Sequence, residues 1–188
     1  MEMAFIKKMV SNLSPARVTL VESDGVVEQV LSAMKESDWV HFACHGVQDL
    51  ASPTDSGLCL ADERRLKLSD IIHLSRPRGG LAFLSACQTA TGDKVLSEEA
   101  IHLAAGMLLA GYGGVIGSMW SIQDNVAPEV AKDVYEQLLR GDGVPDYKEA
   151  ARALHGAVER LCRLGNVKDE SLKEAWFLSW VPFIHVGL

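Results

Sequence analysis

The stretch LAFLSACQTATGD, residues 81–93, changes from an apolar run to a polar loop at Cys87. The run LAFLSA, residues 81–86, has the length and composition of a strand that is buried on both faces. A free cysteine behaves as a small hydrophobe and is among the most buried residue types, so burial is one interpretation of Cys87. The alternative is that the strand carries a nucleophilic thiol to the edge of a sheet.

Similar apolar runs alternate with segments of helical periodicity along the rest of the chain. We expect strands at 17–22, 38–44, 81–86, 113–120 and 180–187, a hairpin at 57–61 and 64–68, and helices at 4–13, 27–34, 69–75, 97–109, 126–138 and 146–164. Strands that are apolar on both faces and alternate with helices form parallel sheets covered on both sides. The sequence therefore predicts an α/β fold with a mostly parallel central sheet and helices on both faces. Pro182 places the last strand at an edge.

The composition is typical of one globular domain. The chain has 188 residues, of which 48% are hydrophobic and 23% charged, close to the globular average. At this length we expect a single domain over residues 1–188. The net charge is -7, and no cluster of Lys and Arg is longer than a pair. Both features argue against nucleic acid or an anionic membrane as a partner.

The cysteine pattern indicates a reducing compartment. The four cysteines, at 44, 59, 87 and 162, include no C-x-x-C pair, and the N-terminus has no secretion signal. We therefore expect a cytoplasmic protein without a disulfide framework. No Cys and His spacing suggests a metal site, so we expect neither a metal nor another cofactor. The sequence also lacks a Gly-rich phosphate loop, which argues against a flavodoxin-like domain that binds small molecules.

One uncharged stretch has the length of a membrane span. The 24 residues from Ala100 to Gln123 carry no formal charge and are long enough to cross a bilayer. However, Tyr112, Gly113 and Gly114 interrupt the stretch, and its two halves differ in period. We therefore expect a buried helix followed by a buried strand.

Polar residues follow three of the expected strands. They are His45 and Gly46 after 38–44, Cys87 after 81–86, and Ser121, Gln123 and Asp124 after 113–120. In open parallel sheets, ligands bind outside the carboxyl ends of the strands. We therefore expect an imidazole, a thiol and a carboxylate at one edge of the sheet.

His45 and Cys87 are a sufficient pair for nucleophilic catalysis. A thiol attacks as its thiolate, and histidine is the side chain best suited to take up its proton near neutral pH. The backbone N–H groups of Gly46 and Cys87 are candidate donors to a developing oxyanion. The spacing alone leaves open that both residues belong to the core. His41 is expected on the same strand face as His45, where a hydrogen-bonded structural role is commoner than metal binding.

Taken together, HFACHG (41–46) and LSACQTATG (84–92) resemble the CHAT domains, relatives of caspases and separases among the cysteine peptidases. Two further segments, GMLLAGYGGVIGSMWSIQD (106–124) and WVPFIHVG (180–187), are similar to later parts of the family pattern and occur in the same order. The resemblance covers the 150 residues from Trp39 to Leu188.

The resemblance implies a caspase-like three-layer fold and a cysteine endopeptidase that acts on protein or peptide substrates. By resemblance, His45 is the catalytic histidine and Cys87 the nucleophile. In separases an Asp shortly after a strand-ending Trp helps to receive an arginine side chain, and Asp124 resembles it, which implies cleavage after Arg or Lys. Helix capping just before Asn125 is the alternative role for Asp124.

The chain also departs from the family pattern. Family members usually have another strand and more helix before the matching region, so we expect a module that lacks this N-terminal strand and helix. CHAT domains often follow helical repeats, which makes a regulatory or helical-repeat protein a candidate partner. The alternative to an enzyme is therefore a catalytically silent regulatory or protein-interaction module that keeps the fold.

Overall fold

The computed structural model describes residues 2–10, 25–47, 49, 51–60, 64–74, 79–85, 87–88, 98–120, 122–123, 125–140, 145–164 and 170–188. The helices are α1 (Glu2–Val10), α2 (Val27–Glu36), α3 (Leu68–Ile72), α4 (Glu98–Leu109), α5 (Val126–Leu138), α6 (Ala150–Leu164) and α7 (Glu170–Trp180), with short 3-10 turns η2 (Pro53–Asp55) and η3 (Tyr147–Glu149). The strands are β1 (Val40–Phe42), β2 (His45–Val47), β3 (Gly57–Cys59), β4 (Arg65–Lys67), β5 (Leu81–Leu84), β6 (Cys87–Gln88), β7 (Gly114–Ser118) and β8 (Phe183–Gly187).

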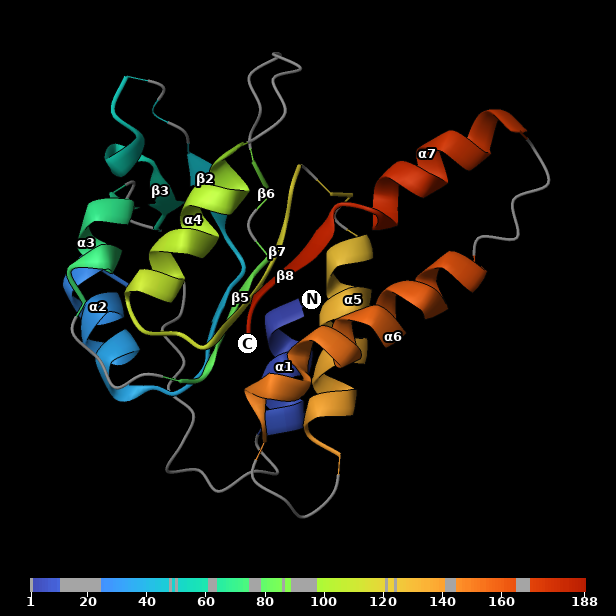
Figure 1. Ribbon diagram of the computed structural model, residues 1–188, viewed down its shortest axis with the longest axis horizontal. Coiled ribbons are helices and arrows are strands. Elements are labelled where there is room, and N and C mark those ends of the chain that lie inside the picture. Colours follow the sequence, from blue (N-terminus) through green and yellow to red (C-terminus); the bar gives the residue numbers. More distant parts are fainter. Residues whose placement is uncertain are drawn as a thin grey trace.

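The described strands form two sheets (Figure 1). The main sheet has the order β1-β5-β7-β8, in which β1, β5 and β7 run parallel and β8 is antiparallel at the edge. The second sheet has the order β4-β3-β2-β6, in which β3 is antiparallel to β2 and β4, and β2 is parallel to β6. The protein is therefore a mixed α/β structure with a mostly parallel main sheet, as the sequence predicts.

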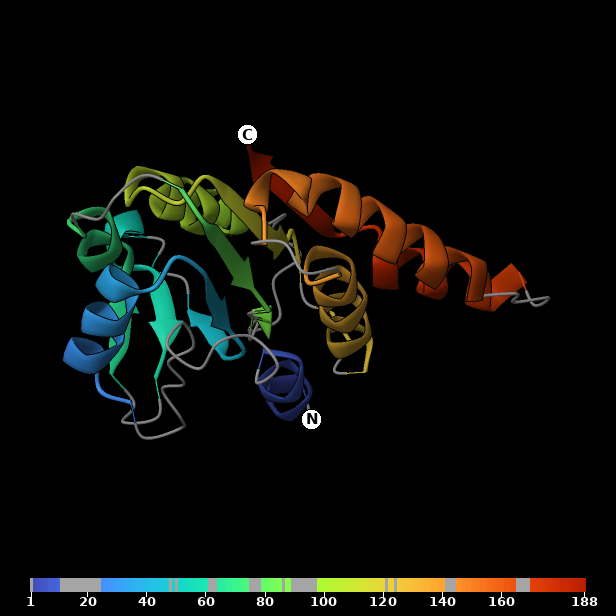
Figure 2. The same ribbon diagram turned by 90° about the horizontal axis from the view of Figure 1, so that it is seen from below.

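Side chains from both faces of the main sheet are buried against helices. Leu81 and Phe83 of β5 belong to an apolar cluster with residues of α1, α5 and α6. Ala82 and Leu84 belong to a second cluster with residues of α2, α3 and α4. Neighbouring residues enter opposite clusters because successive side chains of a strand point to opposite faces. Figure 2 shows the two groups of helices on either side of the strands.

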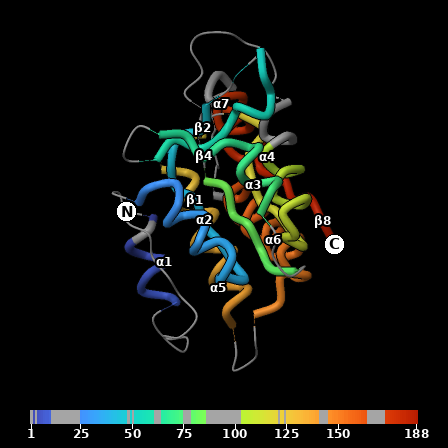
Figure 3. Tube along the Cα trace, turned by 90° about the vertical axis from the view of Figure 1, so that its left-hand side faces the viewer, coloured from blue at the N-terminus to red at the C-terminus, as the bar shows by residue number. Residues whose placement is uncertain are grey.

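The strand β5 is the buried centre of this arrangement. All four of its residues are buried, and full burial of one Leu or Phe side chain contributes about 1.5–3 kcal/mol. On the side of the first cluster, α1 packs beside α5 (Figure 3). This contact joins the N-terminal end of the described chain to a helix more than a hundred residues later.

Most expected elements are present, with shifts at their ends. The expected helices correspond to α1 through α6, and the expected hairpin is formed by β3 and β4. The uncharged stretch contains most of α4 and then β7, as expected, and no helix among the described residues is long and apolar enough to span a membrane. The expected strand at 17–22 lies outside the described residues.

The C-terminal region differs from the prediction. The helix α7 was not predicted. Leu172, Trp176 and Trp180 are four residues apart, but Phe177 and Leu178 are exposed apolar residues outside that row, which weakens the helical period. The strand expected at 180–187 begins at Phe183, since α7 continues to Trp180. Its predicted position at an edge of the sheet is confirmed.

Candidate functional site

The two segments with the family motifs each break once and enter the second sheet. β1 ends at Phe42 and β2 begins at His45, and β5 ends at Leu84 and β6 begins at Cys87. In the main sheet Phe42 is the Cα partner of Leu84, and in the second sheet His45 is the Cα partner of Cys87. Both pairs are 42 positions apart (84 − 42 and 87 − 45). The two segments therefore stay in register through the break.

This register places the backbones of His45 and Cys87 side by side. Neighbouring strands of a sheet lie about 4.8 Å apart. His45 is exposed, whereas Gly46 is buried between β3 and β6, opposite Leu58 and Gln88. The structure thus brings together three of the residues that the sequence singles out. Asp124 and Ser121 lie outside the described residues, and Gln123 is exposed.

One expectation about this segment is wrong. We expected a single strand over 38–44 with His41 and His45 on one face, but the chain breaks at Ala43 and Cys44 and changes sheet. The side chain of His41 is 6% exposed and has hydrogen-bond partners on both ring nitrogens, whereas His45 is exposed. His41 therefore has the hydrogen-bonded structural role that was the alternative to metal binding.

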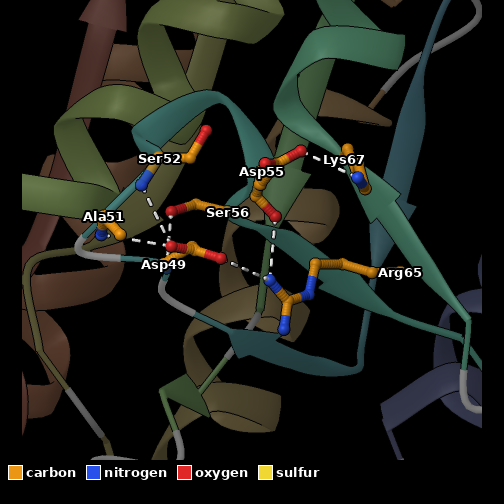
Figure 4. A network of polar contacts seen from close by, with 7 residues as sticks. All are labelled: Asp49, Ala51, Ser52, Asp55, Ser56, Arg65 and Lys67. Carbon is orange, nitrogen blue, oxygen red and sulfur yellow. Dashed lines mark hydrogen bonds and ion pairs between the residues drawn. The ribbon is translucent and has the colours of Figure 1, made fainter.

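The loop after β2 folds around the carboxylate of Asp49 (Figure 4). Asp49 Oδ1 accepts the backbone N–H of Ala51 at 3.1 Å and of Ser52 at 3.0 Å. The N–H of Asp49 donates to Ser56 Oγ at 3.0 Å. These contacts form an Asx turn, in which an aspartate side chain fixes the backbone that follows it.

Two basic residues of β4 hold the same loop against the hairpin. Arg65 Nη1 donates to the carbonyl of Asp55 at 2.9 Å and lies 3.9 Å from Asp49 Oδ2. Lys67 Nζ donates to Asp55 Oδ1 at 2.7 Å, and this hydrogen bond is the main reason that the pKa of Asp55 is lowered. The pair is solvent-exposed, so its contribution to stability is small. The pair connects β4 with η2, in the loop that follows β2.

The other described cysteines differ from one another in exposure. Burial, and secondly the neighbouring Cys59, raises the pKa of the Cys44 thiol to about 12. Cys44 is therefore protonated at neutral pH and is a poor nucleophile. Cys162, on α6, is exposed. Within the described ranges, no three side chains of His, Cys, Asp and Glu come together as metal ligands would.

The chain matches the model of one protein family over almost its whole length. The model of the family described as "CHAT domain" matches residues 2–188. The chain belongs to the CHAT domain family. This family is related to the caspase-like cysteine peptidases. A search of the curated proteins found no significant match. The CHAT match confirms the resemblance carried by HFACHG and LSACQTATG and extends it from Trp39 back to Glu2.

Glu2 makes contacts that the sequence did not predict. It precedes the helix expected at 4–13 and was given no role there, but its carboxylate contacts both His41 and Ser85. The one available signal was that His41 and Ser85 are polar residues inside otherwise apolar, strand-like runs. Buried polar groups are nearly always hydrogen-bonded, so polar residues in such runs are expected to have a hydrogen-bond partner elsewhere in the chain.

Proposed function

We propose that this CHAT domain is a cysteine endopeptidase with a caspase-like three-layer fold, in which Cys87 is the nucleophile and His45 its base. The observation that supports this most directly is the pairing of His45 with Cys87 in neighbouring parallel strands. The exposure of His45 and the relation of the family to cysteine peptidases agree with it. An exposed histidine is accessible both to a substrate and to water.

The proposed reaction has an acylation step and a hydrolysis step. The proton of the Cys87 thiol passes to His45, and the thiolate attacks the carbonyl carbon of a peptide bond. The N–H groups of Gly46 and Cys87 donate to the oxyanion that forms. The C–N bond then breaks, and His45 gives its proton to the departing amine. A water molecule, deprotonated by His45, attacks the thioester and releases the acid and the thiolate.

We further propose that the substrate has Arg or Lys on the amino side of the cleaved bond, held by the carboxylate of Asp124. The support for this role is the family resemblance of the segment that contains Asp124. Replacing Asp124 with Asn should lower kcat/KM for an arginine peptide. Alkylation of Cys87 by iodoacetamide should stay unchanged, because that small reagent needs no arginine site. Equal loss of both would assign Asp124 to helix capping.

Adduct mapping tests the nucleophile and the base together. The full chain, in a Cys162→Ser background that removes the exposed thiol of α6, is treated at neutral pH with a peptidyl-arginine chloromethyl ketone. We expect one adduct, on Cys87, and a much slower reaction in His45→Ala. His155→Ala, which removes another exposed histidine, is the matched control and should react like the parent.

Two results would contradict the proposal. One is an adduct on Cys44 or Cys59 in place of Cys87, and the other is an unchanged rate in His45→Ala. If the folded chain forms no adduct and Cys87→Ala retains its biological effect, the domain is the non-enzymatic interaction module instead.

A further inference from the structure

Glu2, in the first turn of α1, connects two segments of the main sheet through one carboxylate. Its Oε1 lies 3.0 Å from His41 Nε2 on β1, and its Oε2 accepts the hydroxyl of Ser85, directly after β5, at 3.0 Å. The side chains of Glu2 and His41 are 12% and 6% exposed. A carboxylate so little exposed needs partners, because burial of a charged group without compensation is strongly unfavourable.

The other side of the His41 ring is also fixed. Its Nδ1 lies 3.2 Å from the hydroxyl of Tyr135 on α5, and the ring stacks on Phe83 with centroids 4.8 Å apart. The Glu2 carboxylate can only accept hydrogen bonds, so Nε2 of the neutral imidazole carries the hydrogen and donates to it, which leaves Nδ1 to accept from the Tyr135 hydroxyl. Burial, and secondly the Glu2 carboxylate, raises the pKa of Tyr135, so the phenol is protonated and can act as that donor. Every polar group in this network has a partner.

The network lies where both segments leave the main sheet. Ser85 is the first residue after β5, and its N–H donates to the carbonyl of Phe42, the last residue of β1, at 2.8 Å. His45 follows Phe42 by three positions, and Cys87 follows Ser85 by two. Glu2 therefore contacts the first segment four positions before His45 and the second segment two positions before Cys87.

We propose that Glu2 is a positioning residue for His45 and Cys87, and that the docking of α1 beside α5 thereby controls the alignment of the site. This inference rests on the proposed function. Strand pairing in the two sheets determines which residues of the two segments are register partners. The Glu2 carboxylate determines the direction in which the two segments cross from one sheet to the other. Displacement of about 1 Å in an active site can slow a reaction by about a hundredfold.

The chain offers a conservative variant and a matched control. In Glu2→Gln the amide oxygen can still accept from His41 Nε2, and the amide nitrogen can donate to Ser85 Oγ, because a hydroxyl also accepts hydrogen bonds. Glu2→Ala removes both contacts. Glu28→Ala is the control, because Glu28 is also an acidic residue in the first turn of a helix, and its carboxylate pairs with Arg64 on the exposed surface at 3.0 Å. Both alanine variants also remove an acidic side chain from the first turn of a helix, where a negative charge is favourable.

The first measurement compares kcat and KM of the full-length variants on a fluorogenic Ala-Ala-Arg amide, well below the melting temperature of each. We expect Glu2→Ala to lower kcat about tenfold or more and to change KM by about twofold at most. Glu2→Gln should restore kcat to within about threefold of the parent, and Glu28→Ala should match the parent. Equal kcat in Glu2→Ala and Glu28→Ala would overturn the inference, as would a Glu2→Gln variant as slow as Glu2→Ala.

The second measurement separates this inference from the proposed function. Amide hydrogen exchange is followed in peptides covering residues 42–47 and 84–88, where we expect faster exchange in Glu2→Ala than in Glu28→Ala. If the parent protein forms no adduct at Cys87 while the exchange difference is present, the proposed function is wrong, but the effect of Glu2 on the position of the two segments is confirmed. If the parent is active and exchange in these peptides is the same in both variants, the positioning role is wrong.

Discussion

Replacement of Tyr135 by Phe tests the buried network without changing the packing around it. The ring stays in place, so its contacts with Phe83 and Trp39, at centroid distances of 5.8 and 6.4 Å, are retained. The substitution removes the hydroxyl that lies 3.2 Å from His41 Nδ1. That nitrogen then has no tyrosine partner, on a side chain that is 6% exposed. A buried acceptor that loses its partner costs about 1–3 kcal/mol.

We expect Tyr135→Phe to lower the free energy of unfolding by about 1.5 kcal/mol, near the lower end of that range because the hydrogen bond is long. For a chain of this length, about 1 kcal/mol shifts the melting temperature by about 2–4 °C. The melting temperature should therefore fall by about 4 °C. Urea unfolding followed by tryptophan fluorescence at pH 7 gives the free energy directly, with an unchanged m-value as the check that the unfolding transition is comparable.

The pH dependence of this difference has a definite sign. The pKa of Tyr135 is raised in the folded protein, chiefly by burial. Its contribution to stability is therefore fully present below the ordinary tyrosine pKa of about 10 and is lost as the pH rises above that value. The stability difference between the parent and Tyr135→Phe should shrink between about pH 10 and pH 11. A difference that grows in this range would contradict the buried, protonated phenol.

A double-mutant cycle with His41→Leu identifies the contact responsible. In the His41→Leu background the Tyr135 hydroxyl has lost its imidazole partner, so its removal should change stability by less than about 0.5 kcal/mol. The coupling energy should be about 1 kcal/mol. If Tyr135→Phe destabilises both backgrounds equally, within about 0.3 kcal/mol, then the hydroxyl does not act through His41 and the reasoning about the network is wrong.

Three further predictions concern packing, charge and thiol reactivity. In Gly57→Ala the new Cβ overlaps the carbonyl of Leu66. We therefore expect the free energy of unfolding, measured in urea, to fall by about 1–3 kcal/mol. Gly117→Ala is the control, because its Cβ is 3.8 Å from the nearest described atom, and equal losses would contradict the clash. Burial raises the pKa of Asp133, although the neighbouring Arg160 acts in the opposite direction. The free energy of unfolding of the parent should therefore increase relative to that of Asp133→Asn as the pH falls from about 7 to about 4. A difference in this free energy that stays constant with pH would show that the pKa is not raised. Cys44 should resist iodoacetamide at about pH 8 until urea unfolds the chain, and rapid native labelling would show that its thiol is accessible.

Local sequence patterns were sufficient for most of the secondary structure. The run LAFL is apolar at every position and forms β5, with all four residues buried. Val126, Val130, Val134 and Leu138 are four residues apart and form the buried face of α5. Such patterns are reliable because burial of one face is decided within a few residues of chain. The helix α7 escaped prediction because its apolar residues do not gather on one face.

The change of sheet in the family motifs could not be predicted from the same patterns. HFACHG has no turn residue between Phe42 and His45, so it looks like one strand. After the break, β2 pairs with β3, which forms a hairpin with β4 and belongs to the second sheet. Strand pairing partners are distant in sequence, and local periodicity carries no information about which strand will be the neighbour.

The sequence by itself determined the α/β class, the order of most helices and strands, the family and the candidate pair His45 and Cys87. The tertiary structure decided that these two residues are register partners, that the His41 side chain is only 6% exposed and that one carboxylate of α1 reaches both segments. The partners of Glu2 are 39 and 83 positions away along the chain. Contacts of this kind exist only after the sheet and both groups of helices have packed together.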